Sequence, residues 1–330
     1  MRRKHLSSRA VSFIVLGLLL LVIAGCGNEA APSGGSSPNS AAVADLSAEE
    51  IVAQSNTKMA AVKSGSFTAD MALQLQGDTT KITDPTGAAL LGKGITMHAE
   101  GKSASDPVAV DVTMDVSLAD QALALGLLAK GDKMWVGYQD QWYVVDQKNS
   151  AALSAQAQTG AAPTEQLKSF GLDPEDWGTV YKLVGTEDIA GTAVYHVQAT
   201  ADPQKLAAAL MKAANDPDLA KKLGDADTAK QLKETLTQSE EQTAQLQKSL
   251  KDVTVDYWVG VDDMLMRKAE FTAALDTAGV EDMEGVEGMT MKLTVTMSDF
   301  NEPVNVEAPA NAKSLDTLME QMLGGMALGI

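Results

Sequence analysis

Cysteine is almost absent from this chain, since Cys26 is the only one in 330 residues. A single thiol cannot form an intramolecular disulfide, so the folded part must be stabilised by its hydrophobic core. Aromatic residues are also few, at 4% of the chain. The sequence contains no Gly-x-Ser-x-Gly, His-Glu-x-x-His or Walker-type segment. These absences argue against the common hydrolase, zinc-protease and nucleotide-binding sites.

Histidine is scarce as well, with three in the chain. His98 and His196 fall at polar positions of predicted strands, where a solvated side chain is expected. The acidic stretch Glu281–Glu284 is followed by Gly285 and Glu287, but this loop lacks the ligand spacing of an EF-hand. We therefore expect no metal site, no cofactor and no enzymatic activity.

Positive charge is outnumbered by negative charge. Four of the 26 Lys+Arg and none of the 44 Asp+Glu precede Cys26, so the chain from Cys26 onward carries a formal charge of −22. This acidity argues against binding to nucleic acid and against adhesion to anionic lipid headgroups. It favours solubility of the folded part.

Long apolar runs are missing except near the N-terminus, where Val11–Ile23 follows a basic segment. This order is typical of a secretory signal, and the run is too short for a comfortable membrane span. The small residues Ala24 and Gly25 come directly before Cys26. We therefore expect an exported protein.

The tetrapeptide Ile23-Ala24-Gly25-Cys26 resembles the lipobox of bacterial lipoproteins. In that family the cysteine thiol receives a diacylglyceryl group, and the signal peptide, here residues 1–25, is cleaved before it. Two acyl chains hold a protein stably on a membrane, because each buried methylene contributes about 0.8 kcal/mol. The resemblance implies acylation of Cys26, palmitate being one such chain, and a lipid-anchored position on the extracytoplasmic face of the cell membrane. The alternative is an ordinary signal peptide with an incidental cysteine.

The folded part is predicted to start after a tether. Residues 26–45 are rich in Gly, Ser, Pro, Asn and Ala, which predicts a flexible linker with a mean reach of roughly 20–25 Å. The segment Ser47–Glu50 has the form of a capping box and predicts the start of a helix. Gly65 is predicted to end it. The buried stripe of this helix would comprise Ile51, Ser55, Met59 and Val62.

Strands with alternating apolar and polar residues dominate the rest of the chain. The pattern is clear in Phe67–Leu75, Ile95–Glu100 and Val108–Leu118. Alternation over these lengths predicts an antiparallel sheet with one buried face and one solvated face. Leu123–Ala129 is apolar throughout, but the Gly131-Asp132 turn signal that follows favours a strand. Further strands are predicted at Met134–Tyr138, Trp142–Val145, Val180–Ile189, Thr192–Ala199, Val253–Val261, Ala269–Leu275 and Met289–Met297, with a last short edge segment at Val304–Val306.

Two segments interrupt this pattern. Residues 203–251 are rich in Ala, Lys, Leu, Gln and Glu, which predicts a helical hairpin inserted in a single domain that spans residues 46–312. Residues 313–330 form an apolar tail, and within it Ser314–Ala327 is predicted to be an amphipathic helix. No tandem repeat is visible.

Methionine is enriched at the predicted buried strand positions. A thioether surface adapts readily to flexible apolar ligands, although core packing is the simpler interpretation. A long sheet covered by few helices has room for a cavity. The residues expected to line such a cavity are Phe67, Met71, Leu73, Val112, Met114, Trp135, Trp142 and Met291.

Three passages carry a second resemblance. They are Met134–Gly137 with Gln141–Asp146, Asp256–Lys268, and Val295–Pro309. Together with the lipobox they are similar to the actinobacterial lipoproteins of the LppX/LprG type, which share the LolA-like fold. The resemblance implies an α+β protein with a strongly curved antiparallel half-barrel and helices against its concave face. It also implies a hydrophobic cavity for a lipid or an acylated glycolipid.

The sequence thus favours a lipid-anchored, non-enzymatic protein that binds or carries an apolar ligand outside the cytoplasmic membrane. The alternative is a sensory or scaffold lipoprotein with a filled core that binds another envelope protein. In that case the acidic surface and the helical insertion at 203–251 would be the functional parts.

Overall fold

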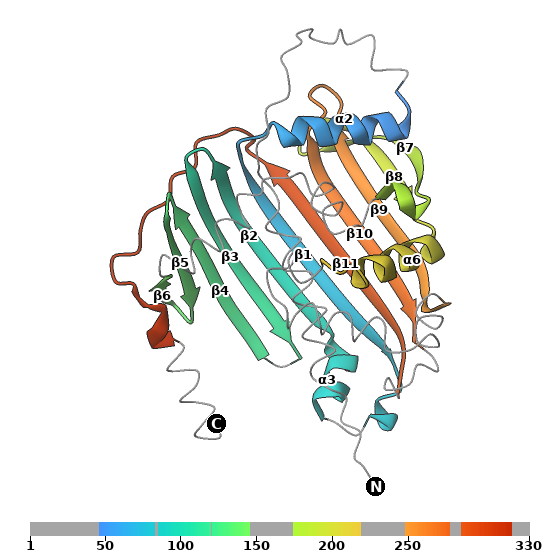
Figure 1. Cartoon of the computed structure of the whole chain (residues 1–330), viewed down its shortest axis with the longest axis horizontal. Coiled ribbons are helices and arrows are strands. Elements are labelled where there is room, and N and C mark those ends of the chain that lie inside the picture. Colours follow the sequence, from blue (N-terminus) through green and yellow to red (C-terminus); the bar gives the residue numbers. More distant parts are fainter. Residues whose placement is uncertain are drawn as a thin grey trace.

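The computed structural model describes residues 46–82, 85–119, 121–145, 174–218, 248–277 and 285–318. The predicted signal peptide, the tether, the acidic loop at 281–284 and most of the predicted helical insertion lie outside these ranges. The described chain is organised around one 12-stranded sheet (Figure 1). None of the helices in the described ranges combines the length and the apolar character that a membrane crossing needs.

The strand order in the sheet is β12-β6-β5-β4-β3-β2-β1-β11-β10-β9-β8-β7. All neighbours pair antiparallel except β12, which pairs parallel with β6. The first half of the sheet comprises β1 (Ser64–Gly77), β2 (Ile95–Ser105), β3 (Val108–Leu118), β4 (Gln121–Lys130), β5 (Lys133–Tyr138) and β6 (Gln141–Val144). The rest comprises β7 (Val180–Ile189), β8 (Thr192–Thr200), β9 (Leu250–Gly260), β10 (Met266–Asp276), β11 (Val286–Ser298) and β12 (Lys313–Ser314).

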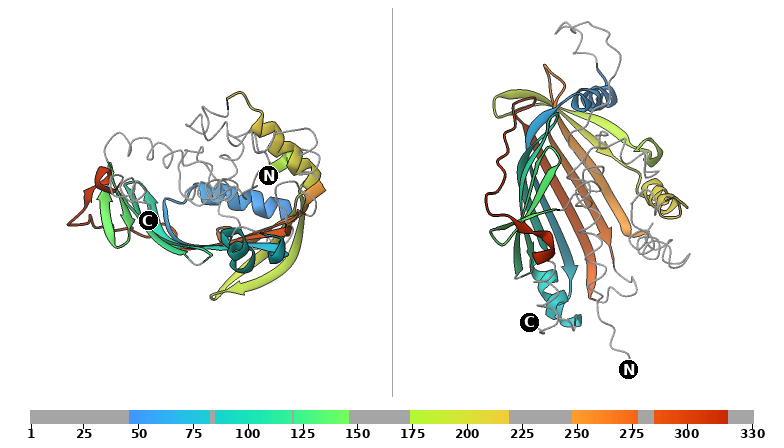
Figure 2. Two further views of the ribbon diagram at one scale, coloured as in Figure 1. Left: turned by 90° about the horizontal axis from the view of Figure 1, so that it is seen from below. Right: turned by 60° about the vertical axis from the view of Figure 1, so that its left-hand side comes forward.

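The register gives the sheet two chemically different faces. Met71 stands level with Met97 in β2 and with Leu293 in β11, on what we call the inner face. The neighbouring residue Asp70 stands level with His98 and lies on the outer face. The sheet is strongly curved, and Figure 2 shows α2 and α6 on its concave side. The predicted fold class is therefore confirmed.

Helix α2 (Ala48–Ala60) closes one end of the inner face. The predicted capping box is confirmed, because the Glu50 N–H donates to Ser47 Oγ at 3.2 Å and the Ser47 N–H donates to Glu50 Oε2 at 2.8 Å. Ile51 is 1% exposed and packs with Val197 and Val259. The sequence placed the end of this helix too late. It ends at Ala60 with Ala61 as its C-cap, and Gly65 lies in β1, paired with Ser103.

Two further helices pack on the inner face. In α3 (Pro85–Lys93), Leu90 packs into a cluster with Met71 and Met97 at the end opposite α2. In α6 (Pro203–Ala214), Leu206 packs against Val253 of β9. Helix α6 lies at the start of the predicted helical insertion at 203–251. Residues 215–218 form a turn, residues 219–247 lie outside the described ranges, and Leu250 and Lys251 already belong to β9. Short 3-10 turns occupy η2 (Thr79–Lys81) and η3 (Pro174–Trp177).

The chain that follows β11 crosses the outer face, and we call residues 302–312 the outer arm. The predicted edge strand at Val304–Val306 is wrong, because this segment is irregular in the structure. Val306 is 4% exposed and packs on the sheet instead of pairing with a strand. The arm leads into β12, and residues 315–318 are helical. The rest of the predicted C-terminal helix lies outside the described residues.

Candidate functional site

The inner face from β11 to β5 is a continuous apolar surface. One row of aligned residues runs across it through Val295, Ala69, Ala99, Met114 and Leu125. A parallel row runs through Met297, Phe67, Gly101, Val112 and Leu127. Ala69, Ala99 and Gly101 are the small residues of these rows, and larger apolar side chains surround them. This surface is the candidate functional site.

The predicted lining residues divide into two groups on this face. Met71 and Leu73 are each 4% exposed and belong to the packed cluster under α3. Phe67, Val112, Met114 and Met291 also lie on the inner face and are only half-buried. Met114 and Met291 border the cluster under α3, whereas Phe67 and Val112 are not part of it.

Trp135 and Trp142, which were also predicted to line the cavity, do not lie on the inner face. Trp135 stands level with Leu128 and Asp111, which lie on the outer face. Trp142 stands level with Gly137 and covers the backbone there, so it also lies on the outer face. Both indoles pack in the cluster under the outer arm. The register therefore removes both tryptophans from the candidate site.

Three further half-buried side chains belong to this surface. Leu125 and Leu127 of β4 and Val136 of β5 are aligned with Met114 and Val112 through the strand register. The sequence alone does not assign their face, because β4 is apolar at both odd and even positions and shows no alternation. Pairing with the alternating strand β3 is the signal that assigns their face.

None of the helices in the described ranges has its main contacts with β3, β4 or β5. Helix α2 contacts β7, β8, β9 and β10, α6 contacts η3 and β9, and α3 contacts β1 and η2 as their main neighbours. Where α2 covers the sheet the environment is apolar, and burial, with a smaller contribution from Tyr181, raises the pKa of the Tyr257 phenol. The apolar inner face of β2–β5 is thus continuous with the apolar area that the helices cover.

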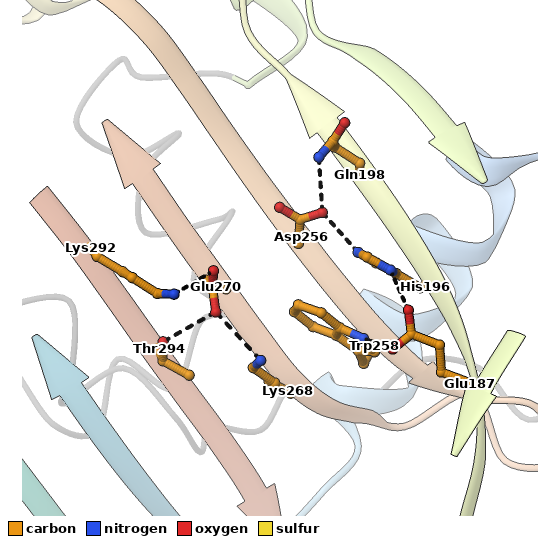
Figure 3. A network of polar contacts seen from close by, with 9 residues as sticks. All are labelled: Glu187, His196, Gln198, Asp256, Trp258, Lys268, Glu270, Lys292 and Thr294. Carbon is orange, nitrogen blue, oxygen red and sulfur yellow. Dashed lines mark hydrogen bonds and ion pairs between the residues drawn. The ribbon is translucent and has the colours of Figure 1, made fainter. Parts of the chain in front are cut away.

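The outer face over β7–β11 carries a polar network (Figure 3). His196 Nδ1 is 2.7 Å from Glu187 Oε1, and His196 Nε2 is 2.8 Å from Asp256 Oδ1. The imidazole stacks on Trp258 with ring centroids 4.5 Å apart, and the Trp258 indole N–H donates to Glu187 Oε2 at 2.9 Å. These contacts join three neighbouring strands, and they correct the prediction of a solvated His196, whose side chain is 15% exposed.

A second part of the network centres on Glu270. Its carboxylate is 2.9 Å from Lys292 Nζ and 3.4 Å from Lys268 Nζ. Burial acts to raise the pKa of Glu270, but the hydrogen bonds and positive charges of Lys292 and Lys268 outweigh it, so the pKa is lowered. Lys268 also lies over the Trp258 ring, 4.0 Å from its centroid. The outer face is therefore held together by charges and hydrogen bonds.

A depression of about 420 Å³ lies beside this network on the outer face. Its lining includes Asp70, His98, Asp115 and Lys292. His98 is about half exposed, as predicted, and its hydrogen bond to Asp70, more than the nearby carboxylates, raises its pKa. These four side chains come from β1, β2, β3 and β11, so the depression crosses the middle of the sheet. Within the described ranges no group of three or more His, Cys, Asp or Glu side chains is placed to hold a metal ion.

A family of unknown function, DUF6612, matches residues 47–172. No curated protein matches the chain.

Similar solved structures include the lipoprotein LppX from Mycobacterium tuberculosis, with 15% sequence identity, a TM-score of 0.35, and coverage of 80% of this chain and 100% of that one. LprF from Mycobacterium bovis has 13% identity, a TM-score of 0.37, and coverage of 84% of this chain and 100% of that one. A domain described as an outer membrane lipoprotein-sorting protein, from Vibrio parahaemolyticus, has 10% identity, a TM-score of 0.21, and coverage of 78% and 95%. LppX belongs to the group of lipoproteins that the sequence motifs resemble.

Proposed function

We propose that this chain binds or carries a lipid, or another ligand with long apolar chains, on the inner face of its sheet. The observation that supports the proposal is the row of half-buried apolar side chains on β3, β4 and β5, strands with which none of the described helices makes its main contacts. Each square ångström of apolar surface removed from water contributes about 25 cal/mol. An acyl chain laid along this surface would bury hydrocarbon on both sides of the contact.

The composition of the surface suits a flexible ligand. Met114 and Met291 have unbranched thioether side chains that change rotamer easily and fill irregular gaps. Between Phe67 and Met114 the side chains are small or absent, at Ala69, Ala99 and Gly101, so the backbone lies close to the surface there. A surface of this kind selects for apolar volume more than for a fixed pattern of hydrogen bonds, which favours lipids and acylated glycolipids as the ligand class.

The direct test is organic extraction of the full-length protein purified from its own host, followed by mass spectrometry. We expect about one lipid, or one set of acyl chains, per protein. A chain that yields no lipid above the level of a control membrane protein purified in parallel would contradict the proposal. That result would favour the alternative function, a scaffold lipoprotein with a filled core that binds another envelope protein.

The anchor is a second part of the proposal. The lipobox-like sequence before Cys26 supports acylation of its thiol and a position on the extracytoplasmic face of the cell membrane. We expect Cys26→Ala to prevent acylation and to move the protein out of the acylated membrane pool, as measured by metabolic labelling with palmitate and by fractionation. Retention of the label in the Cys26→Ala chain would show that another group carries the lipid.

A further inference from the structure

Strand β7 forms one edge of the sheet, and three of its aliphatic side chains are exposed to solvent. Val180 is 68% exposed, Leu183 is 43% exposed and Val184 is 49% exposed. An edge strand offers backbone N–H and C=O groups to another strand, and natural edges are usually protected by charges or cover. Aliphatic side chains on both sides of such an edge indicate a surface that pairs with a partner.

The middle of β7 allows close approach of another backbone. The pairing of β7 with β8 shifts between Leu183 and Gly185, so Val184 is an extra, bulged residue. A Cβ atom placed on Gly185 would meet no heavy atom within 4 Å. Glycine inside a strand often marks a position that another backbone approaches.

From these features we infer that β7 pairs antiparallel with β7 of a second copy of this chain, about a twofold axis between Val184 and Gly185. This register places Val180 opposite Ile189 and Lys182 opposite Glu187 of the partner copy. The faces agree. Lys182 is aligned with Gln198 on the outer face, and Glu187 reaches His196 and Trp258 on the same face. Cross-strand pairs must share a face to interact. Because of the twofold axis, the dimer would contain two pairs between Lys182 of one copy and Glu187 of the other.

A shift by one residue loses this match. It would place Lys182 opposite Asp188, which is aligned with Ala193 on the inner face. The two charges would then project from opposite sides of the extended sheet. Charge and face thus select one register, and the partner that satisfies both is a second copy of the chain.

The expected dimer is weak in solution. One strand pair buries less than the roughly 800 Å² per partner of a standard interface. Anchoring of both copies to one membrane would raise their effective concentration and favour pairing there. The inference does not depend on ligand binding, so it can fail or succeed separately from the proposed function.

The first test is sedimentation equilibrium of the purified full-length protein in detergent. Wild type should self-associate reversibly. Lys182→Glu should weaken the dimer about tenfold or more, because two like-charged cross-strand pairs appear at once. The matched control is Lys133→Glu, the same charge reversal at an exposed lysine of β5, which should leave the dissociation constant unchanged.

The second test uses a pair of variants to check the register. Glu187→Lys should weaken the homodimer as Lys182→Glu does, whereas an equimolar mixture of the two variants should associate, since every charge then faces its opposite. Circular dichroism checks that Glu187→Lys is folded, because it gives up contacts to His196 and Trp258. If it does not fold, the comparison of Lys182→Glu with Lys133→Glu decides alone. A wild type that stays monomeric, equal effects of both lysine variants, or a folded mixture that does not associate would overturn the inference.

Discussion

Replacing Met114 by glutamate should remove most of the lipid that copurifies with the chain, by tenfold or more. Met114 lies half-buried in the middle of the inner face, aligned with Ala99 and Leu125. A carboxylate at this position would lose hydration wherever an acyl chain covered it, and burial of an unpaired charge costs several kcal/mol. The measurement is the ratio of extracted lipid to protein, by mass spectrometry, for variant and wild type purified in parallel.

Ser117→Glu is the matched control. Ser117 lies on the same strand, β3, but is exposed on the outer face. It introduces the same charge, so effects of net charge on expression, export or purification should be equal in the two variants. Met114→Leu, which keeps the surface apolar, should retain lipid. Equal lipid content in folded Met114→Glu and Ser117→Glu proteins would show that the inner face over β3 does not hold the ligand.

Replacing Gly126 by alanine should destabilise the fold by about 1–3 kcal/mol, a typical cost of overpacking. Gly126 in β4 and Gly137 in β5 are directly paired, and the ring of Trp142 lies over both. A Cβ atom at Gly126 would come within 2.5 Å of Trp142 Cη2, so the indole would have to leave its place under the outer arm. Chemical denaturation gives the change in the free energy of unfolding.

Two comparisons make this prediction specific. Gly92→Ala, in α3 with no atom within 4 Å of the new methyl group, should be neutral or slightly stabilising. In a Trp142→Leu background the cost of Gly126→Ala should largely disappear, because the clashing ring is gone. If Gly126→Ala costs the same with and without the indole, the contact with Trp142 is not its cause.

Much of the fold could be predicted from local sequence. The capping box at Ser47 predicts the start of α2, and the alternation in Phe67–Leu75 and Val108–Leu118 predicts which side chains of β1 and β3 share a face. Period two is a local property of an extended chain, so Phe67 and Met114 could be assigned to the inner face without knowledge of their neighbours.

The errors lie where distant segments decide the environment. Leu128 and Trp135 are apolar residues on the outer face because the outer arm, more than a hundred residues later, covers them. The apolar Leu128 removes the alternation in β4, and the apolar character of Trp135 in β5 suggested the wrong face for it. His196 was expected in solvent because its partners, Glu187 and Asp256, come from the two adjacent strands. Single-sequence patterns carry no information on such partners.

The outer arm ties together strands that are otherwise linked only through their neighbours. Three of its carbonyl groups accept hydrogen bonds from the sheet. Ser64 of β1 donates to Glu302, Lys130 of β4 donates to Val306, and Gln141 of β6 donates to Asn311. A wide unclosed sheet would otherwise be free to flatten or roll. Three hydrogen bonds to the outer arm hold the curvature of this half of the sheet. We therefore expect the helices and the methionine side chains, and not the strands, to adjust to ligands of different size.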